Sequence, residues 1–156
     1  MTGRVQAEIK QKKPFRLREE EAFVNVQRTA DALLQGLAET LKPAGLSATQ
    51  YNVLRILRGA EPKGLACREI GERMVTRDPD VTRLLDRLED RGLVTRTRDR
   101  GDRRVITTRI TDDGLRILGE LEAPIADMHT RQLGHLGAAR LRTLIDLLER
   151  ARSQVR

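Results

Sequence analysis

A helical pattern followed directly by two β-branched segments, within residues 78–111, limits most strongly how this chain can fold. The helical part carries one apolar stripe, at Val81, Leu84, Leu85 and Leu88. Asp78 is a good N-cap, Pro79 suits the first helical position, and Gly92 is typical of the residue that ends a helix. The pattern predicts one amphipathic helix with a polar outer face.

The two segments after this helix predict a β-hairpin. They read LVTRTR at 93–98 and RVITTRI at 104–110, and a polar turn that contains Gly101 joins them. A short helix at 67–74 precedes the amphipathic helix. Two helices with a tight connection, followed by a hairpin, make a winged helix-turn-helix. We therefore expect a mainly α fold with a small β-hairpin wing.

Longer helical patterns precede this unit. The first spans residues 17–41, with apolar residues at helical spacing: Phe23, Val26, Ala30, Leu33, Leu34, Leu37 and Leu41. Pro43 and Gly45 end that helix. Ser47 and Gln50 then predict a capping box at the start of a second helix, whose buried face is Val53, Leu54 and Leu57.

Two further helices follow the hairpin. Thr111 is the expected N-cap of the first, and Pro124 should kink or break it. The last helix, at about 138–153, is expected to bury four apolar side chains, Leu141, Leu144, Ile145 and Leu148.

Charge and composition narrow the classes of partner. The chain has a formal net charge of +7, mostly from arginine, which suits a polyanion such as nucleic acid or an anionic membrane surface. An arginine-rich genome would give the same composition. Aromatic residues make up 2%, which argues against single-strand binders that stack bases. One cysteine, no signal-peptide pattern and no apolar run of about 20 residues predict a cytoplasmic protein without a membrane span.

The amphipathic helix and the hairpin are complementary to double-stranded DNA. The major groove of B-DNA admits one α-helix, and a hairpin tip can reach the neighbouring minor groove, where the negative potential favours arginine. Nearby phosphates would also offset the mutual repulsion of the arginines around Gly101. The residues therefore indicate a DNA-binding protein.

Several motifs together resemble the MarR family of bacterial winged-helix regulators. They are LSATQYNVLRIL, REIGERM, DPDVTRLLDRLEDRGLV, DRGDRRVITTRIT and DDGLRIL, within residues 46–118. The resemblance implies a homodimer that binds a pseudo-palindromic operator, usually as a repressor, and releases it when a small ligand or an oxidant reaches the dimer cleft. It divides the chain into a flexible basic segment (1–15), an N-terminal dimerisation helix (16–45), a winged helix-turn-helix DNA-binding lobe (46–111) and C-terminal dimerisation helices (112–156).

Ten residues are candidate DNA contacts. On and before the amphipathic helix they are Thr76, Arg77, Asp80, Thr82, Arg83 and Arg87, and in the wing they are Arg100, Asp102, Arg103 and Arg104. Arg83 is the best candidate for a bidentate contact to guanine. Arg104 resembles the family arginine that enters the minor groove, and Asp102 the acid that holds it. The alternative is a solvated helix face on which Arg83 and Arg87 pair with Asp86 and Asp90.

Other functions have less support in the sequence. Phe23, Tyr51 and Arg55 lie on helices that line the effector cleft in the family, although packing or surface roles explain them as well. Cys67 is expected to be a structural cysteine, and the two histidines do not form a metal site. We find no catalytic triad, phosphate-binding glycine loop or inward carboxylate pair, so we expect neither an enzyme nor a cofactor. The competing hypothesis is a winged helix used as a protein-interaction or architectural module without a specific operator.

Overall fold

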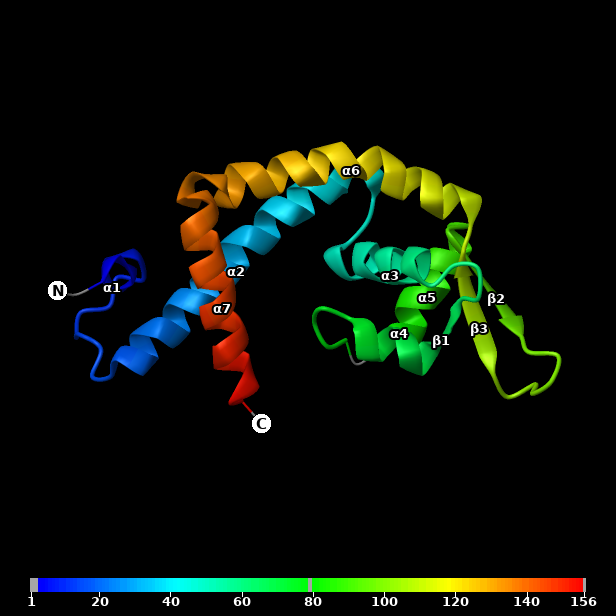
Figure 1. Cartoon of the computed structure of the whole chain (residues 1–156), viewed down its shortest axis with the longest axis horizontal. Coiled ribbons are helices and arrows are strands. Elements are labelled where there is room, and N and C mark those ends of the chain that lie inside the picture. The colour runs from blue at the N-terminus through cyan, green and yellow to red at the C-terminus, as the bar shows by residue number, and fades with distance from the viewer. Residues whose placement is uncertain (1–2, 79, 156) are drawn as a thin grey trace.

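The computed structural model describes residues 3–78 and 80–155. In chain order the elements are α1 (Arg4–Glu8), α2 (Arg18–Leu41), the 3-10 turn η1 (Lys42–Ala44), α3 (Ala48–Gly59), β1 (Leu65–Ala66), α4 (Cys67–Arg73), α5 (Val81–Asp90), β2 (Val94–Arg98), β3 (Ile106–Ile110), α6 (Asp112–Leu133), the 3-10 turn η2 (Gly134–Leu136) and α7 (Gly137–Ser153). Two long helices, α2 and α6, contact each other, with the lobe from α3 to β3 at one end and α1 and α7 at the other (Figure 1). The predicted fold class is confirmed.

The core lies in the lobe and continues along α6. Its buried side chains come from the apolar stripes that the sequence predicts for α3 and α5, together with the sheet and α6. Leu54, Leu57 and Leu88 are fully buried, and each such side chain stabilises the fold by about 1.5–3 kcal/mol relative to exposure. The lobe is therefore a rigid support for the surface that α5 and the hairpin present.

The hairpin belongs to a three-stranded antiparallel sheet with the order β1-β3-β2. β2 and β3 pair as predicted, with Val94 opposite Ile110 and Arg98 opposite Ile106. The sequence analysis missed β1, which pairs Leu65 with Thr108. A strand of two residues is too short to show an alternating pattern, and only its pairing with β3 defines it.

Local signals placed most helix ends correctly. Ser47 and Gln50 form the predicted capping box, in which the Ser47 hydroxyl accepts from the Gln50 backbone N–H at 3.1 Å. The Thr111 hydroxyl accepts from the Gly114 backbone N–H at 3.2 Å at the start of α6. Gly92 follows α5 with φ of 70°, a left-handed conformation that glycine adopts without a steric penalty.

The predicted start of α5 was wrong. Asp80, not Asp78, is the N-cap, and its carboxylate accepts from the Arg83 backbone N–H at 3.0 Å. Asp78 instead accepts from the Asp80 backbone N–H at 2.8 Å, which continues the loop before the helix. Both residues are good caps in sequence, and the packing of Val81 onto the core decides between them. Pro79, predicted at the first helical position, lies outside the described residues.

α6 is not broken at Pro124. The helix is continuous from Asp112 to Leu133, with Pro124 inside it. Proline removes the hydrogen bond to the carbonyl of Glu120, but both residues lie on the exposed side of the helix, where water can satisfy that carbonyl. Leu121, Ile125 and Met128 pack into the core on the other side and hold the helix together.

The outer helices bury less apolar surface than expected. None of the four apolar residues predicted to be buried on α7 is buried, and Ile145 is 54% exposed. On α2 only Leu41 is buried, and Phe23 is 63% exposed. The other described residues cover these faces only in part. The segment 1–15, predicted to be flexible, contains α1, whose Val5 is buried.

Candidate nucleic-acid interface

α4 and α5 form the predicted helix-turn-helix, with α5 as its outward-facing second helix. Leu84, Leu85 and Leu88 face the core because they share one helical stripe. The opposite side of α5 is exposed and carries Arg83 and Arg87. A polar, positively charged side of a short helix fits the dimensions of the DNA major groove.

The tip of the hairpin presents its arginines to solvent. The Asp99 backbone N–H donates to the Val105 carbonyl at 2.9 Å and closes the turn. Within it, Arg100, Arg103 and Arg104 are all exposed. The resemblance assigned Asp102 to hold Arg104, and it does so through the backbone, because its carboxylate accepts from the Arg104 N–H at 3.0 Å. The Arg104 guanidinium therefore stays free of that carboxylate.

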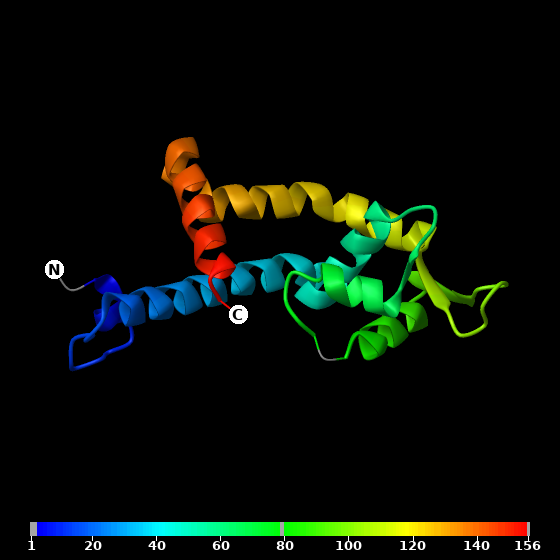
Figure 2. The ribbon, with the colours of Figure 1, turned by 60° about the horizontal axis from the view of Figure 1, so that its bottom comes forward.

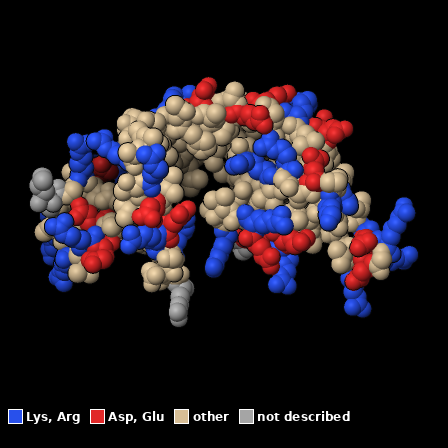
Figure 3. All heavy atoms as spheres, in the orientation of Figure 1, with Lys and Arg blue, Asp and Glu red and all other residues tan. Residues whose placement is uncertain are grey.

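α5 and the wing lie beside each other in the lobe. β2 contacts α5, and the two views agree that the hairpin extends outward next to α4 and α5 (Figures 1 and 2). Lys and Arg side chains project from the edge of the lobe below α4 and α5 and from the wing tip (Figure 3). One molecular surface therefore combines a groove-sized helix with a basic hairpin.

The arginines on this surface are not neutralised by the chain. Among the described residues, no ion pair involves Arg83, Arg87, Arg100, Arg103 or Arg104. The alternative in which Arg83 and Arg87 pair with Asp86 and Asp90 is therefore not what the structure shows. Unpaired guanidinium groups are available for phosphate or base contacts.

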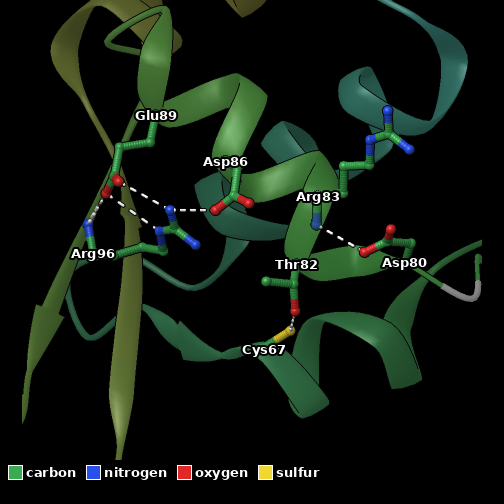
Figure 4. Close-up of polar contacts among 7 residues, drawn as sticks. All are labelled: Cys67, Asp80, Thr82, Arg83, Asp86, Glu89 and Arg96. Carbon is green, nitrogen blue, oxygen red and sulfur yellow. Dashed lines mark hydrogen bonds and ion pairs between the residues drawn. The ribbon is translucent and has the colours of Figure 1, made fainter.

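Arg96 on β2 is the residue that sequence analysis missed. Its guanidinium donates to Asp86 at 2.6 Å and to Glu89 at 2.9 Å, and its backbone N–H also donates to Glu89, at 3.1 Å (Figure 4). These hydrogen bonds from Arg96 lower the pKa of the Glu89 carboxyl and raise the pKa of Arg96 itself. The register of β2 could have suggested that Arg96 pairs with acidic residues. No local sequence pattern, however, shows which residues of α5 face β2.

All ten candidate DNA contacts are exposed, but the side chains of three of them, Asp80, Thr82 and Asp102, make contacts within the protein. Asp80 caps α5. The Thr82 hydroxyl lies 3.7 Å from the Cys67 thiol, at the contact between α5 and α4 (Figure 4). Thr76 and Arg77 lie in the loop that enters α5. The structure thus brings the arginines of α5 and of the wing to one lobe, and gives Asp80 and Thr82 local structural contacts.

Two of the three candidate effector residues meet at a pocket. Tyr51 and Arg55 line a cavity of about 140 Å³, next to Val75 and Thr76 of the loop before α5. The Arg55 guanidinium lies 5.8 Å from the centre of the Tyr51 ring, within the range of a cation–π contact. Phe23 is not part of this pocket. Cys67 is half-buried, and no cluster of three metal-binding side chains occurs in the described part of the chain.

No helix between residues 3 and 155, as far as the structure describes them, combines the length and the apolarity of a membrane span.

Comparison with known proteins shows which family has a similar sequence and fold. The MarR family model matches residues 46–106. A crystal structure of a MarR transcription factor from Planctomyces limnophilus is 46% identical, with a TM-score of 0.69, over 86% of this chain and 98% of that one. A mutant MarR from E. coli, complexed with operator DNA, is 26% identical with a TM-score of 0.74, over 81% and 89% of the two chains.

A curated relative matches in sequence over part of its length. The HTH-type transcriptional repressor MdtR of Bacillus subtilis (strain 168) is 35% identical over 94 residues. That match covers 58% of this chain and 59% of the relative, so the chain spans little more than half of it. The match to the Planctomyces structure is nearly complete, and it includes both the winged lobe and the long flanking helices. The chain belongs to the MarR family.

Proposed function

We propose that this protein is a sequence-specific, double-stranded-DNA-binding transcriptional regulator: a cytoplasmic homodimeric repressor that a small-molecule effector releases from a pseudo-palindromic operator. The main support is the juxtaposition of α5 with a wing tip whose arginines, Arg100, Arg103 and Arg104, form no ion pair within the described chain. A protein interface would need a matching acidic surface to pair those charges, whereas the phosphates of any DNA duplex neutralise them.

The two elements have different roles in this proposal. Arg83, at the start of α5, reads a base edge in the major groove, and Arg87 lies one turn further along the same face. Arg100, Arg103 and Arg104 contact phosphates or enter the minor groove at the wing tip. The E. coli relative complexed with operator DNA supports a DNA-binding use of this fold.

The homodimer is supported by apolar surface that the chain leaves open. Exposed side chains on α2 and α7 include Phe23, Val26, Leu34, Ile145 and Leu147. Exposed apolar groups on two helices at the same end of the molecule are typical of an association surface (Figure 1). A two-fold dimer would place the two α5 helices about 34–36 Å apart, one turn of B-DNA.

The proposal also includes repression of transcription and release from DNA by an effector. The relative from B. subtilis is named as a repressor. The Tyr51–Arg55 pocket borders the loop that enters α5, and at about 140 Å³ it is smaller than the roughly 300 Å³ or more of most ligand sites. We expect a ligand to widen this pocket, in which Val75 and Thr76 of that loop form part of the wall. Such a ligand shifts the DNA-binding equilibrium only by its difference in affinity for the narrow and the widened pocket.

The test is selection of bound sequences from a random duplex pool, repeated with phenolic and other anionic small molecules. A regulator binds one palindromic site about 10³ times or more tighter than random DNA. An effector then weakens binding to that site. Enrichment of no sequence, with uniform affinity for all duplexes, would instead identify an architectural DNA-binding module.

A further inference from the structure

The contacts of Arg96 separate the charges of α5 into two groups. Asp86 and Glu89 point toward β2, where the Arg96 guanidinium binds both carboxylates (Figure 4). The Arg83 side chain extends away from Asp86 in the same view. Two acidic side chains of the helix, Asp86 and Glu89, are therefore held on the wing side, whereas Arg83 and Arg87 form no ion pair among the described residues.

Asp86 is close to Arg83 along the helix. Residues three apart on an α-helix are neighbours, so the Asp86 carboxylate is within reach of Arg83 once nothing else binds it. The side chain of Asp86 is still 54% exposed in the pair, and that of Arg96 only 22%. The Asp86 carboxylate therefore lies at the surface of the lobe, whereas the Arg96 side chain that neutralises it is mostly buried.

We propose that Arg96 is a positioning residue for DNA binding, which sequesters the Asp86 and Glu89 carboxylates so that the exposed side of α5 keeps its positive charge. This role rests on the proposed function of the protein. Without Arg96, Asp86 would compete with DNA for Arg83, and two uncompensated carboxylates would lie within a Debye length, about 8–10 Å, of the groove-facing side chains. Each would repel phosphate.

Removing either the arginine or the two carboxylates breaks the same ion pairs. Comparing the two changes separates the positioning role from a structural one. Arg96→Gln releases both carboxylates and is expected to weaken binding to the selected duplex about tenfold or more. The double variant Asp86→Asn/Glu89→Gln breaks the same ion pairs but removes the negative charges, so its affinity should equal or exceed that of the wild type. The triple variant with all three changes should bind close to the wild-type affinity.

Arg116 on α6 supplies matched controls for net charge. It forms ion pairs with Glu120 at 3.0 Å and with Asp113 at 3.8 Å, an arginine with two acidic partners outside the winged motif. Arg116→Gln changes the net charge as Arg96→Gln does, and Asp113→Asn/Glu120→Gln changes it as the other double variant does. Both controls should bind within about twofold of the wild type, as expected for charges far from the interface.

Fluorescence anisotropy measures the affinity of each variant for the selected duplex and for random DNA. Thermal unfolding shows whether each variant folds. If both double and triple variants bind as weakly as Arg96→Gln, the pair only holds the lobe together and the proposal is wrong. If Arg96→Gln does not fold, the Asp86→Asn/Glu89→Gln variant decides: weaker binding than its charge control contradicts the proposal. A wild type that prefers no duplex would refute the proposed function itself, and this role with it.

Discussion

At the residue scale, two arginines on one surface are expected to meet DNA in different ways. Arg83 lies on a helix that the core holds rigidly through Leu84, Leu85 and Leu88. Arg104 lies on an exposed turn fixed mainly by backbone hydrogen bonds. A rigid support favours base recognition, which needs fixed geometry, and an exposed turn favours contact with the potential of the phosphates.

Arg83→Ala should therefore relax sequence choice at one base pair in each half-site. A bidentate arginine–guanine contact discriminates by about 1–3 kcal/mol, and alanine cannot provide it. The measurement is affinity for a series of duplexes, each with one base pair of the selected site changed. If all duplexes weaken equally, Arg83 contacts only phosphate.

Arg104→Ala should weaken binding to every duplex and reduce the dependence on salt. Loss of one phosphate contact lowers the slope of log K against log salt concentration by about 1. Titrations at several salt concentrations give this slope. Arg140→Ala on α7, outside the winged motif, is the control for net charge, and a change of equal size in that variant would contradict the role of Arg104.

At the element scale, the wing and α5 act as one unit because Arg96 links them. The link joins residues that are seven and ten positions apart in sequence but belong to different secondary structures. The Glu89 pKa is lowered chiefly by its hydrogen bond with Arg96. The ionised carboxylate thus stabilises the native lobe.

This shift predicts how stability depends on pH. Since folding lowers the pKa of Glu89, its contribution is present above the unfolded value of about 4.3 and is lost as the pH falls through the lower native value. Glu89→Gln should reduce the free energy of unfolding by about 0.2–1 kcal/mol at pH 7, a range set by the exposure of the pair. Urea denaturation should show a smaller difference from wild type at pH 3 than at pH 7.

A glutamate outside the lobe makes the control for this measurement. Glu149 on α7 has no ion pair within the part of the chain that the structure describes. Glu149→Gln should therefore leave stability unchanged at both pH values. A deficit of Glu89→Gln that is as large at pH 3 as at pH 7 would mean that the carboxylate charge is not the stabilising feature.

At the scale of the whole molecule, the chain is divided between a packed lobe and an open end. The lobe buries the stripes of α3 and α5, whereas α2 and α7 leave apolar faces exposed (Figure 1). Covering those faces with a second copy would remove apolar area from water, which stabilises association by roughly 25 cal/mol per Å² before the entropic cost.

Ile145→Asp should shift the protein from dimer to monomer. The side chain is 54% exposed in the single chain, so the change should not unfold it, but a charge in an apolar interface is costly. Light scattering after size exclusion measures the mass. Thr143→Asp places the same charge on the opposite side of α7 and should leave the dimer intact. An unchanged mass for Ile145→Asp would exclude α7 from the interface.

The sequence by itself determined the features that depend on neighbouring residues. The capping box at Ser47, the left-handed Gly92 and the stripe of α5 follow from contacts within a turn or two of helix, so local patterns predict them. The two β-branched segments likewise predict the hairpin, although β3 begins at Ile106, two residues later than the predicted segment 104–110.

The features that join distant segments depend on tertiary contacts, which local sequence patterns do not show. Strand β1 exists because β3 offers it a partner, and Asp80 becomes the N-cap of α5 because Val81 packs on the core. Arg96 finds Asp86 and Glu89 only when β2 lies against α5. The exposed face of α7 likewise has apolar spacing typical of a buried helix, and the fold of one chain leaves it open because the other described residues cover it only in part.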